Sequence, residues 1–121
     1  MDPRPEGLLA WQWKQYPEGH TRRRNLVIHI LTVPVFQLGS LVLLGSIVMG
    51  AWAALIGIGL MAVAMAAQGR GHAAEPQPPA RFLGPLDVLA RILAEQWITF
   101  PRFVRSGGFG RAWEASSSDL R

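Results

Sequence analysis

Residues 25–69 read NLVIHILTVPVFQLGSLVLLGSIVMGAWAALIGIGLMAVAMAAQG and contain no Asp, Glu, Lys or Arg. At a rise of ~1.5 Å per residue, a helix of this length would be about twice as long as the ~30 Å hydrocarbon core of a bilayer. The stretch therefore predicts two transmembrane helices, at about residues 25–44 and 47–68, which reverse at Gly45-Ser46 because glycine permits a tight turn. Two very apolar helices of a soluble bundle are the alternative, but neither helix keeps a polar face for water.

Arginine flanks the apolar stretch at both ends, with Arg22, Arg23 and Arg24 before it and Arg70 after it. Because basic segments stay on the cytoplasmic side, both termini are expected in the cytoplasm. The net charge of +4 comes with no separate basic domain, so lipid headgroups are expected as partners and nucleic acid is not. The chain has no cysteine, which excludes disulfides, thiolate metal ligands and a cysteine nucleophile.

The residues before the apolar stretch predict a short helix at the membrane interface. Leu9, Trp13 and Tyr16 recur at helical spacing, and Pro17 ends the pattern. Tryptophan and tyrosine are typical of the boundary between lipid and water, so this helix is expected to lie along the membrane.

A further helix is expected over about residues 86–100, after Gly84-Pro85 and before Pro101. Its apolar side chains share one face, which is formed by Leu86, Leu89, Leu93, Trp97 and Phe100 and is widened by Val88 and Ile92. Charged residues recur every fourth position as Asp87, Arg91 and Glu95. This polar stripe is either a ladder of i,i+4 salt bridges that faces water or a set of side chains that orient metal-bound histidines.

These segments predict an all-α membrane protein. The expected architecture is a transmembrane helical hairpin with an N-terminal interfacial helix and a C-terminal amphipathic or buried helix. Residues 1–114 form a single membrane-embedded helical domain in this interpretation, and residues 115–121 form a disordered tail.

His29 lies inside the most apolar part of the chain, where an imidazole without a partner is costly. His20 and His72 lie just outside the two ends of the same stretch. In an antiparallel hairpin the start of the first helix and the end of the second meet at one membrane face, so His29 and His72 are expected to be neighbours. His20 would lie opposite His29 on a continuous helix, but Pro17 and Gly19 allow it to fold back.

Amide and carboxylate side chains accompany these histidines. Asn25 precedes His29 by four residues and Gln68 precedes His72 by four, so each amide shares a helix face with its histidine. Glu75 follows His72 by three residues and could add a carboxylate. Such a set can hold iron(II) with positions open for dioxygen and a chelating substrate, and zinc would also fit. Alternatively, the histidines bond carbonyls or lipid headgroups, and Glu75 is a solvated loop carboxylate.

Two linked motifs carry a resemblance to a known family. The first is Tyr16-Pro-Glu-Gly-His20-x4-Asn25-x3-His29-x4-Pro34, and the second is Gln68-x2-Gly71-His72-x2-Glu75-x3-Pro79-Ala80. Over roughly residues 10–105 the chain resembles the membrane-bound, iron(II)-dependent 2-hydroxy fatty acid dioxygenases of fatty acid α-oxidation. It departs from many relatives at Thr32-Val33, where they carry Gly-Ile, and Glu75 stands one residue closer to its histidine than in the fungal members.

The resemblance implies that His20, His29 and His72 are catalytic and bind iron, with Asn25 and Gln68 in support and Glu75 as a weaker candidate ligand. It implies that O2 shortens a 2-hydroxy fatty acid by one carbon at the cytoplasmic membrane of a bacterium. Arg22, Arg23 and Arg24 could hold the substrate carboxylate, or they could serve only as a topology signal. The acyl chain would lie between the hairpin and the helix over residues 86–100.

Functions of other classes stay open on the sequence alone. A small membrane scaffold, with or without assembly into a homo-oligomer, would use the histidines and amides only to tie helices together. A transporter subunit would line a pathway with polar groups, but Gln37 and Ser40 are the only deep polar side chains midway along the first helix. A haem protein would use His29 and His72 as axial ligands.

Overall fold

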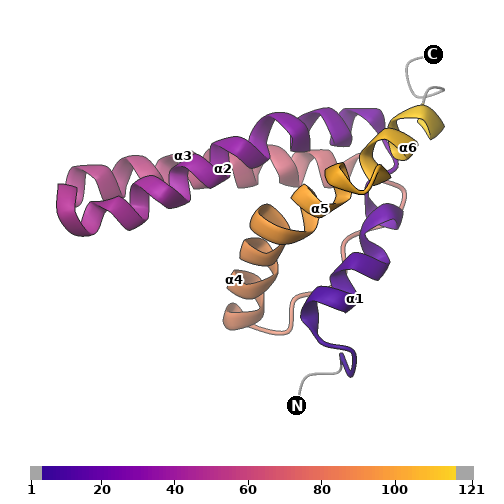
Figure 1. The fold of residues 1–121 in the computed structure, drawn as a ribbon, viewed down its shortest axis with the longest axis horizontal. Coiled ribbons are helices and arrows are strands. Elements are labelled where there is room, and N and C mark those ends of the chain that lie inside the picture. The colour runs from indigo at the N-terminus through magenta and orange to yellow at the C-terminus, as the bar shows by residue number, and fades with distance from the viewer. Residues whose placement is uncertain (1–3, 117–121) are drawn as a thin grey trace.

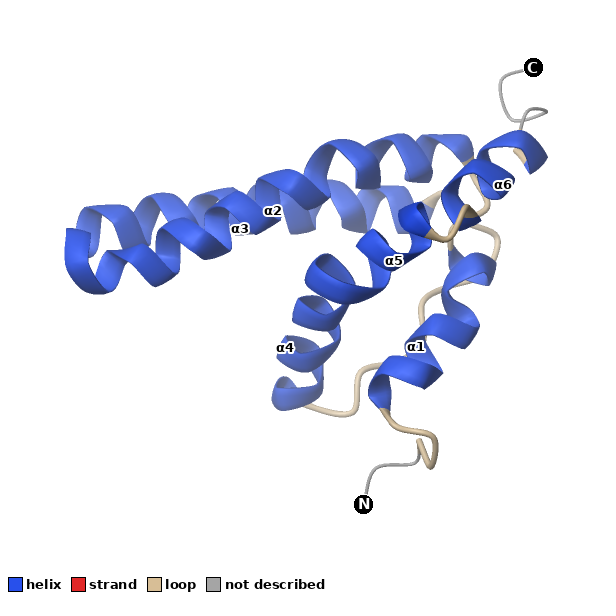
Figure 2. Cartoon of the chain, viewed as in Figure 1, coloured by secondary structure: helices blue, strands red, loops and turns tan. Residues whose placement is uncertain are grey.

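The computed structural model describes residues 4–116, and every regular element in that range is a helix (Figures 1 and 2). The prediction of an all-helical chain is confirmed. In chain order the elements are α1 (Leu8–Gln15), the 3₁₀-helix η1 (Tyr16–Gly19), α2 (Arg23–Met49), α3 (Ala51–Ala73), α4 (Pro85–Ala94), the π-helix η2 (Glu95–Thr99), α5 (Phe100–Arg105) and α6 (Gly108–Ala115).

Helices α2 and α3 run side by side in opposite directions and extend beyond the rest of the molecule (Figure 1). Both are long and apolar enough to cross a membrane. The chain reverses at Gly50, whose φ of 102° is rare for residues with a side chain. The predicted turn at Gly45-Ser46 was wrong, because both residues lie within α2, where Ser46 Oγ bonds the Leu43 carbonyl at 2.6 Å. Both helices are consequently longer than predicted.

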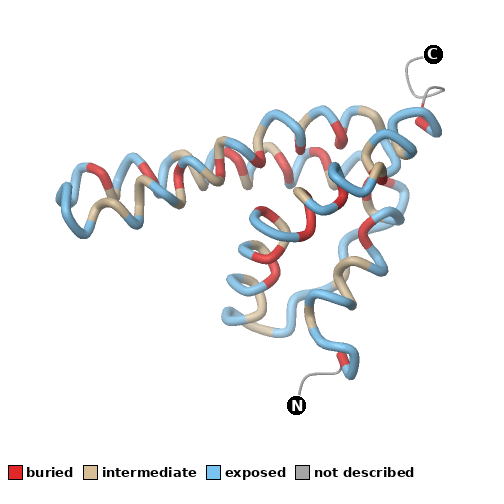
Figure 3. The backbone as a smooth tube through the Cα atoms, in the orientation of Figure 1, coloured by how far each residue is buried: buried red, intermediate tan, exposed pale blue. Residues whose placement is uncertain are grey.

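The outer surface of the α2–α3 pair is apolar. Figure 3 shows exposed positions along its whole length, and the exposed fractions reach 91% at Val48, 82% at Ile47 and 73% at Leu55. From Val27 to Gly69, no exposed residue has a polar side chain. A continuous apolar surface of this extent is typical of contact with lipid or with another protein.

Two glycines let α2 and α3 approach closely. A Cβ atom at Gly57 would lie 2.6 Å from the Gly39 carbonyl oxygen and 2.7 Å from the Leu43 backbone nitrogen. A Cβ atom at Gly39 would likewise lie 2.8 Å from the Gly57 carbonyl oxygen. Small residues at a helix crossing are a common device of membrane helix pairs, because they bring the two backbones into contact.

Helix α4, the π-helix η2 and α5 follow one another without a break (Figure 1). The π-helix contacts α2 and α1, and α4 contacts α1. The prediction that this helix ends before Pro101 was wrong, since α5 continues to Arg105. Proline has no N–H and its ring collides with the carbonyl four residues earlier in a regular α-helix. The π-turn widens the helix just before Pro101, where the N–H of Phe100 bonds the carbonyl of Glu95, five residues earlier.

The hydrophobic core lies where η1, α2 and α5 meet. It consists of Tyr16, Leu26, Val33, Phe100 and Phe103, each no more than 4% exposed. Helix α6 adds Phe109 and Ala112 to this core. The predicted tail therefore begins too early, because Ala115 belongs to α6 and Ser116 is buried beneath it, whereas residues 117–121 lie outside the described residues.

We expect Gly57→Ala to destabilise the protein by about 1–3 kcal/mol, because the new methyl group meets backbone atoms of α2 that cannot move aside. The midpoint of thermal unfolding in detergent should fall accordingly. Gly59→Ala is the matched control, since a Cβ atom there meets nothing within 4 Å, and it should leave the midpoint unchanged or raise it. Equal midpoints for the two variants would contradict the close crossing.

Candidate metal centre

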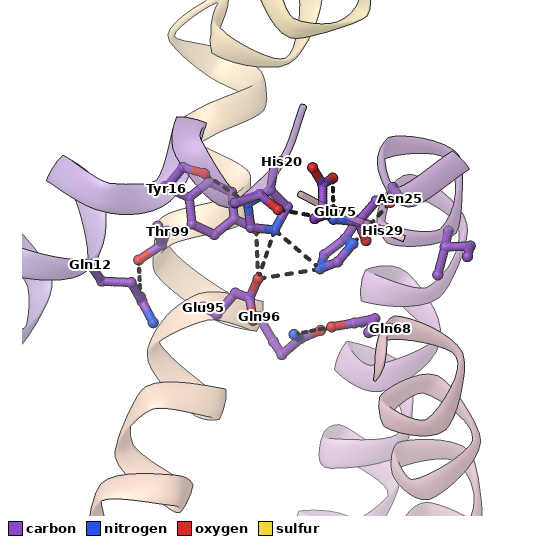
Figure 4. Close-up of polar contacts among 12 residues, drawn as sticks. Gln12, Tyr16, His20, Asn25, His29, Gln68, Glu75, Glu95, Gln96 and Thr99 are labelled. Atoms are coloured by element: carbon purple, nitrogen blue, oxygen red, sulfur yellow. Dashed lines mark hydrogen bonds and ion pairs between the residues drawn. The ribbon is translucent and has the colours of Figure 1, made fainter. Parts of the chain in front are cut away.

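Three histidines and one glutamate converge where the N-terminal end of α2 meets the C-terminal end of α3. His20, His29, His72 and Glu95 each offer one ligand atom, and these four atoms all lie within 4.8 Å of one another. His20 Nε2 lies 3.4 Å from His29 Nε2, and Glu95 Oε2 lies 3.5 Å from the first and 3.4 Å from the second (Figure 4). His29 is fully buried and His20 is 4% exposed.

The imidazole rings surround one common point. Their centroids lie 4.7 Å apart for His20 and His29, 4.9 Å for His20 and His72, and 5.0 Å for His29 and His72. Each pair of ring planes is nearly perpendicular, at 80–86°. The three rings therefore direct their edges toward a shared centre and do not stack on one another.

Backbone carbonyls fix which ring nitrogens face that centre. His20 Nδ1 lies 2.8 Å from the carbonyl oxygen of Tyr16, and His29 Nδ1 lies 3.0 Å from that of Asn25. A carbonyl can only accept a hydrogen bond, so each Nδ1 carries the proton and each Nε2 of a neutral ring presents a lone pair. Two such lone pairs and the Glu95 carboxylate face one another, and a metal ion or a proton among them would relieve their mutual repulsion.

The distances fit a single metal ion. The ligand atoms of His20, His29 and Glu95 lie 3.4–3.5 Å apart. This separation corresponds to the edge of a tetrahedron whose bonds are about 2.1 Å long, which is the usual bond length for imidazole nitrogen and carboxylate oxygen on zinc. Three nitrogens and one oxygen also suit iron(II) with open positions. Proton-bearing Nδ1 atoms held by carbonyls are a common feature of metal-binding histidines.

Tyr16 completes the surroundings of Glu95. Its hydroxyl donates a hydrogen bond to Glu95 Oε2 at 2.7 Å, and its ring stacks on His20 with centroids 3.8 Å apart. Burial opposes ionisation of Glu95, but its contacts with the His20 and His29 rings outweigh burial and hold the pKa of this carboxyl well below its usual value. Burial and then the charge of Glu95 raise the pKa of Tyr16 well above its usual value, so Tyr16 remains a neutral donor.

Glu95 is the member of this group that sequence reasoning did not select as a ligand. The three residues of the predicted polar stripe have two different roles in the structure. Asp87 and Arg91 form an i,i+4 ion pair at 3.7 Å, whereas Glu95 lies beside the histidines. The first π-helical residue is Glu95 itself. The sequence holds one signal for this irregularity, which is a proline placed shortly after an otherwise regular helical pattern.

Glu75 lies outside the group of four and has another role. Its carboxylate accepts hydrogen bonds from the backbone N–H groups of Thr21 and Arg22, the hydroxyl of Thr21 and the amide of Asn25, at 2.6–3.2 Å (Figure 4). Arg22 is the N-cap of α2 and supplies no side-chain cap. Glu75 therefore caps α2 from just beyond the end of α3, and the negative charge suits a helix N-terminus.

The two predicted supporting amides lie in hydrogen-bonded networks beside the histidines. Asn25 donates to Glu75 Oε2 at 2.9 Å and to the Gly19 carbonyl at 3.1 Å. Gln68 and Gln96 form a reciprocal amide pair at 2.7 and 3.0 Å, and Gln68 also donates to Thr32. These bonds join η1, α2, α3 and η2, the elements that carry or precede the four candidate ligands.

A cavity of about 510 Å³ opens beside the histidines, between α1, α3, α4 and the 74–84 loop. His20, His72 and Glu95 line one part of it, and Trp11, Met65, Phe82 and Ile92 contribute apolar walls. The arginines that the sequence suggested for a substrate carboxylate do not line this cavity. Arg22, Arg23 and Arg24 line a separate hollow with Trp113, and Arg23 stacks on the Trp113 ring at 4.0 Å.

Comparisons of the chain with protein-family models, curated proteins and solved structures find no match. The resemblance to 2-hydroxy fatty acid dioxygenases therefore stays a prediction that rests on the two motifs. The geometry of the four side chains and of the adjoining cavity stands independently of it.

Glu75→Gln should lower the thermal unfolding midpoint at pH 7 but have a smaller effect in acid. Burial alone would raise the pKa of Glu75, but hydrogen bonds from Thr21, Arg22 and Asn25 outweigh it and lower this pKa. A carboxyl whose pKa is lowered by folding stabilises the protein above its unfolded-state value of ~4.3, and this stabilisation is lost as the pH falls through the folded-state pKa. The gap between wild type and variant should therefore narrow below about pH 4.3.

Glu18→Gln is the control, because Glu18 is exposed. It should unfold with the wild-type midpoint at both pH values. A gap for Glu75→Gln that does not change with pH would show that the Glu75 charge does not contribute to the cap.

Proposed function

We propose that this chain is a membrane metalloenzyme in which His20, His29, His72 and Glu95 hold one iron(II) ion, and that it uses O2 to shorten 2-hydroxy fatty acids by one carbon. The observation that carries the proposal is the convergence of His20 Nε2, His29 Nε2 and Glu95 Oε2, because the backbone carbonyls that bond both Nδ1 atoms leave the Nε2 atoms to bind a metal. Such a set of lone pairs is stable when a cation binds it. The donor set has no sulfur and suits iron(II), with zinc as the other metal that fits.

The proposal includes a transmembrane hairpin formed by α2 and α3, with both termini in the cytoplasm. Its apolar outer surface and the arginines at residues 22–24 and 70, all at one end, support this topology. Helix α4 and η2 expose only Pro85, Leu86, Leu89, Ala90, Leu93, Trp97 and Ile98. By contrast, α5 and α6 expose Arg102, Arg105 and Arg111. This change in surface supports a position of the candidate metal centre near the boundary between lipid and water.

The cavity supports a substrate with a long apolar part. Its volume of about 510 Å³ is within the usual range for small-molecule sites, ~300–1,000 Å³. It lies between α3 and α4, where the acyl chain was expected from the sequence. The motif resemblance adds the 2-hydroxy acid, and the balanced reaction converts it with O2 into a fatty acid one carbon shorter, carbon dioxide and water.

Each part of the site has a defined task in this proposal. Iron(II), when bound, supplies the capacity to activate dioxygen. The carbonyls of Tyr16 and Asn25 hold the rings of His20 and His29, and the Tyr16 hydroxyl holds Glu95 in place. The apolar walls of the cavity orient the acyl chain and exclude water from the acid end.

The other functional classes are less well supported. The deep polar residues Gln37 and Ser40 bond the Gln96 carbonyl and Trp97 Nε1, at 2.8 and 3.0 Å, so they attach η2 to α2 and do not mark a pathway. The rings of His29 and His72 are only 5.0 Å apart, with His20 and Glu95 beside them, which leaves no room for a haem between the two rings.

The test has two stages, beginning with anaerobic iron(II) loading and removal of free metal. Wild type should retain about one iron per chain, and His29→Ala and Glu95→Gln should lose it, whereas Glu18→Gln should retain it. Size-exclusion chromatography and circular dichroism identify the variants that remain folded. Equal iron retention by wild type and the folded His29 and Glu95 variants would refute the metal centre.

The second stage supplies the loaded wild type with 2-hydroxyhexadecanoic acid and O2, with mass spectrometry of the products. Pentadecanoic acid and carbon dioxide are expected from wild type and from Glu18→Gln, and neither product from Glu95→Gln. Iron retention without shortened acid would refute the substrate and leave the metal centre intact.

A further inference from the structure

Arg91 is the only arginine or lysine among the described residues that line the cavity. It lies one helical turn before Glu95 in the continuous helix formed by α4 and η2, so the Cβ atoms of the two residues are about 6 Å apart on one helix face. Arg91 and the candidate metal centre therefore line the same cavity. No task in the metal centre itself accounts for this residue.

Among the described residues, Arg91 has no carboxylate within hydrogen-bond distance. Both oxygens of Asp87 bond Arg4, at 2.7 and 3.0 Å, whereas the distance from Asp87 to Arg91 Nη1 is 3.7 Å, too long for a hydrogen bond. Arg91 Nη1 and Nη2 donate instead to the carbonyls of Arg81 and Ala80, at 3.0 and 2.9 Å. Carbonyls are neutral, so they do not balance the charge of Arg91, and the Asp87 carboxylate is already hydrogen-bonded to Arg4.

Burial makes this imbalance costly. Arg91 is 9% exposed, and its guanidinium lies 4.1 Å from the centre of the Phe82 ring and 5.1 Å from that of Trp11. Aromatic faces attract a cation but do not neutralise it, and a buried charge is expensive unless it is paired. The guanidinium has five N–H donors in a planar fork, which matches a carboxylate, and the two carbonyls do not use all of them.

We propose that Arg91 binds the carboxylate of the substrate, so that the cavity takes a long-chain carboxylic acid whose acid group lies between Arg91 and the His–Glu group. The apolar walls then hold the chain. This inference rests on the proposed function, which assigns the reaction to the carboxyl end of the acid. Binding of the acid to Arg91 does not itself require a metal. In this proposal Arg91, and not Arg22, Arg23 or Arg24, binds the substrate carboxylate.

The test measures binding of decanoic acid and of decanamide, which has the same chain and no charge, to the metal-free protein in detergent at pH 8. Wild type should bind the acid at least about tenfold more tightly than the amide, as expected for a charge-assisted contact. Arg91→Gln should remove this preference by weakening only acid binding, and Arg91→Lys should restore part of it. Arg24→Gln is the control and should keep the wild-type preference.

A second variant keeps the proposal testable if Arg91→Gln does not fold. Arg4→Gln leaves Arg91 in place but frees Asp87 to neutralise it, so acid binding should weaken while amide binding stays the same. Equal wild-type affinities for acid and amide, a preference that survives in folded Arg91→Gln, or an unchanged preference in Arg4→Gln would overturn the proposal. An acid preference in a protein that retains no iron would refute the metal centre and leave Arg91 as the acid-binding residue.

Discussion

Electron-pair donors that face one another repel unless a cation lies among them, and this constraint explains most of the structure around the histidines. The Tyr16 and Asn25 carbonyls turn the lone pairs of His20 and His29 toward Glu95. The capping of α2 by Glu75 and the pairing of Gln68 with Gln96 hold the elements that carry these groups in register. Without a cation, these hydrogen bonds would hold the His20, His29 and Glu95 side chains together against their mutual repulsion. With a cation bound, the same hydrogen bonds preorganise the binding site.

The irregular parts of the fold serve the same arrangement. The π-turn before Pro101 frees the Gln96 carbonyl from the helical ladder, and Gln37 from the apolar α2 helix donates to it at 2.8 Å. A backbone carbonyl without a hydrogen-bond partner would be costly in this apolar setting. The Gln37 side chain therefore compensates for the hydrogen bond that the Gln96 carbonyl does not make within the helix. The hydrogen bond between Gln37 and the Gln96 carbonyl thus attaches the continuous helix of α4 and η2, which carries Arg91 and Glu95, to α2.

Much of this arrangement could be predicted from the sequence, because it follows from local rules. The uncharged stretch gives two apolar helices, and antiparallel packing brings His29 and His72 to one end, while Pro17 and Gly19 allow His20 to fold back. The position of the turn could not be predicted, since composition does not distinguish Gly45 from Gly50. Glu95, expected in a salt-bridge ladder or in support of the histidines, joins the histidines, whereas Glu75 caps α2 because α3 ends at Ala73. Pro101 is a local signal for the π-turn, but the sequence does not show which side chain the turn directs to the histidines.

The central claim is that one ion is bound by three imidazoles and one carboxylate. X-ray absorption at the metal edge of the iron-loaded wild type tests it most directly, because imidazole rings give a characteristic multiple-scattering pattern. We predict three imidazole nitrogens and at least one oxygen at about 2.1 Å, close to the bond lengths common in histidine and carboxylate sites. An oxygen-only shell, or a spectrum that is the same in His29→Ala, would contradict the account.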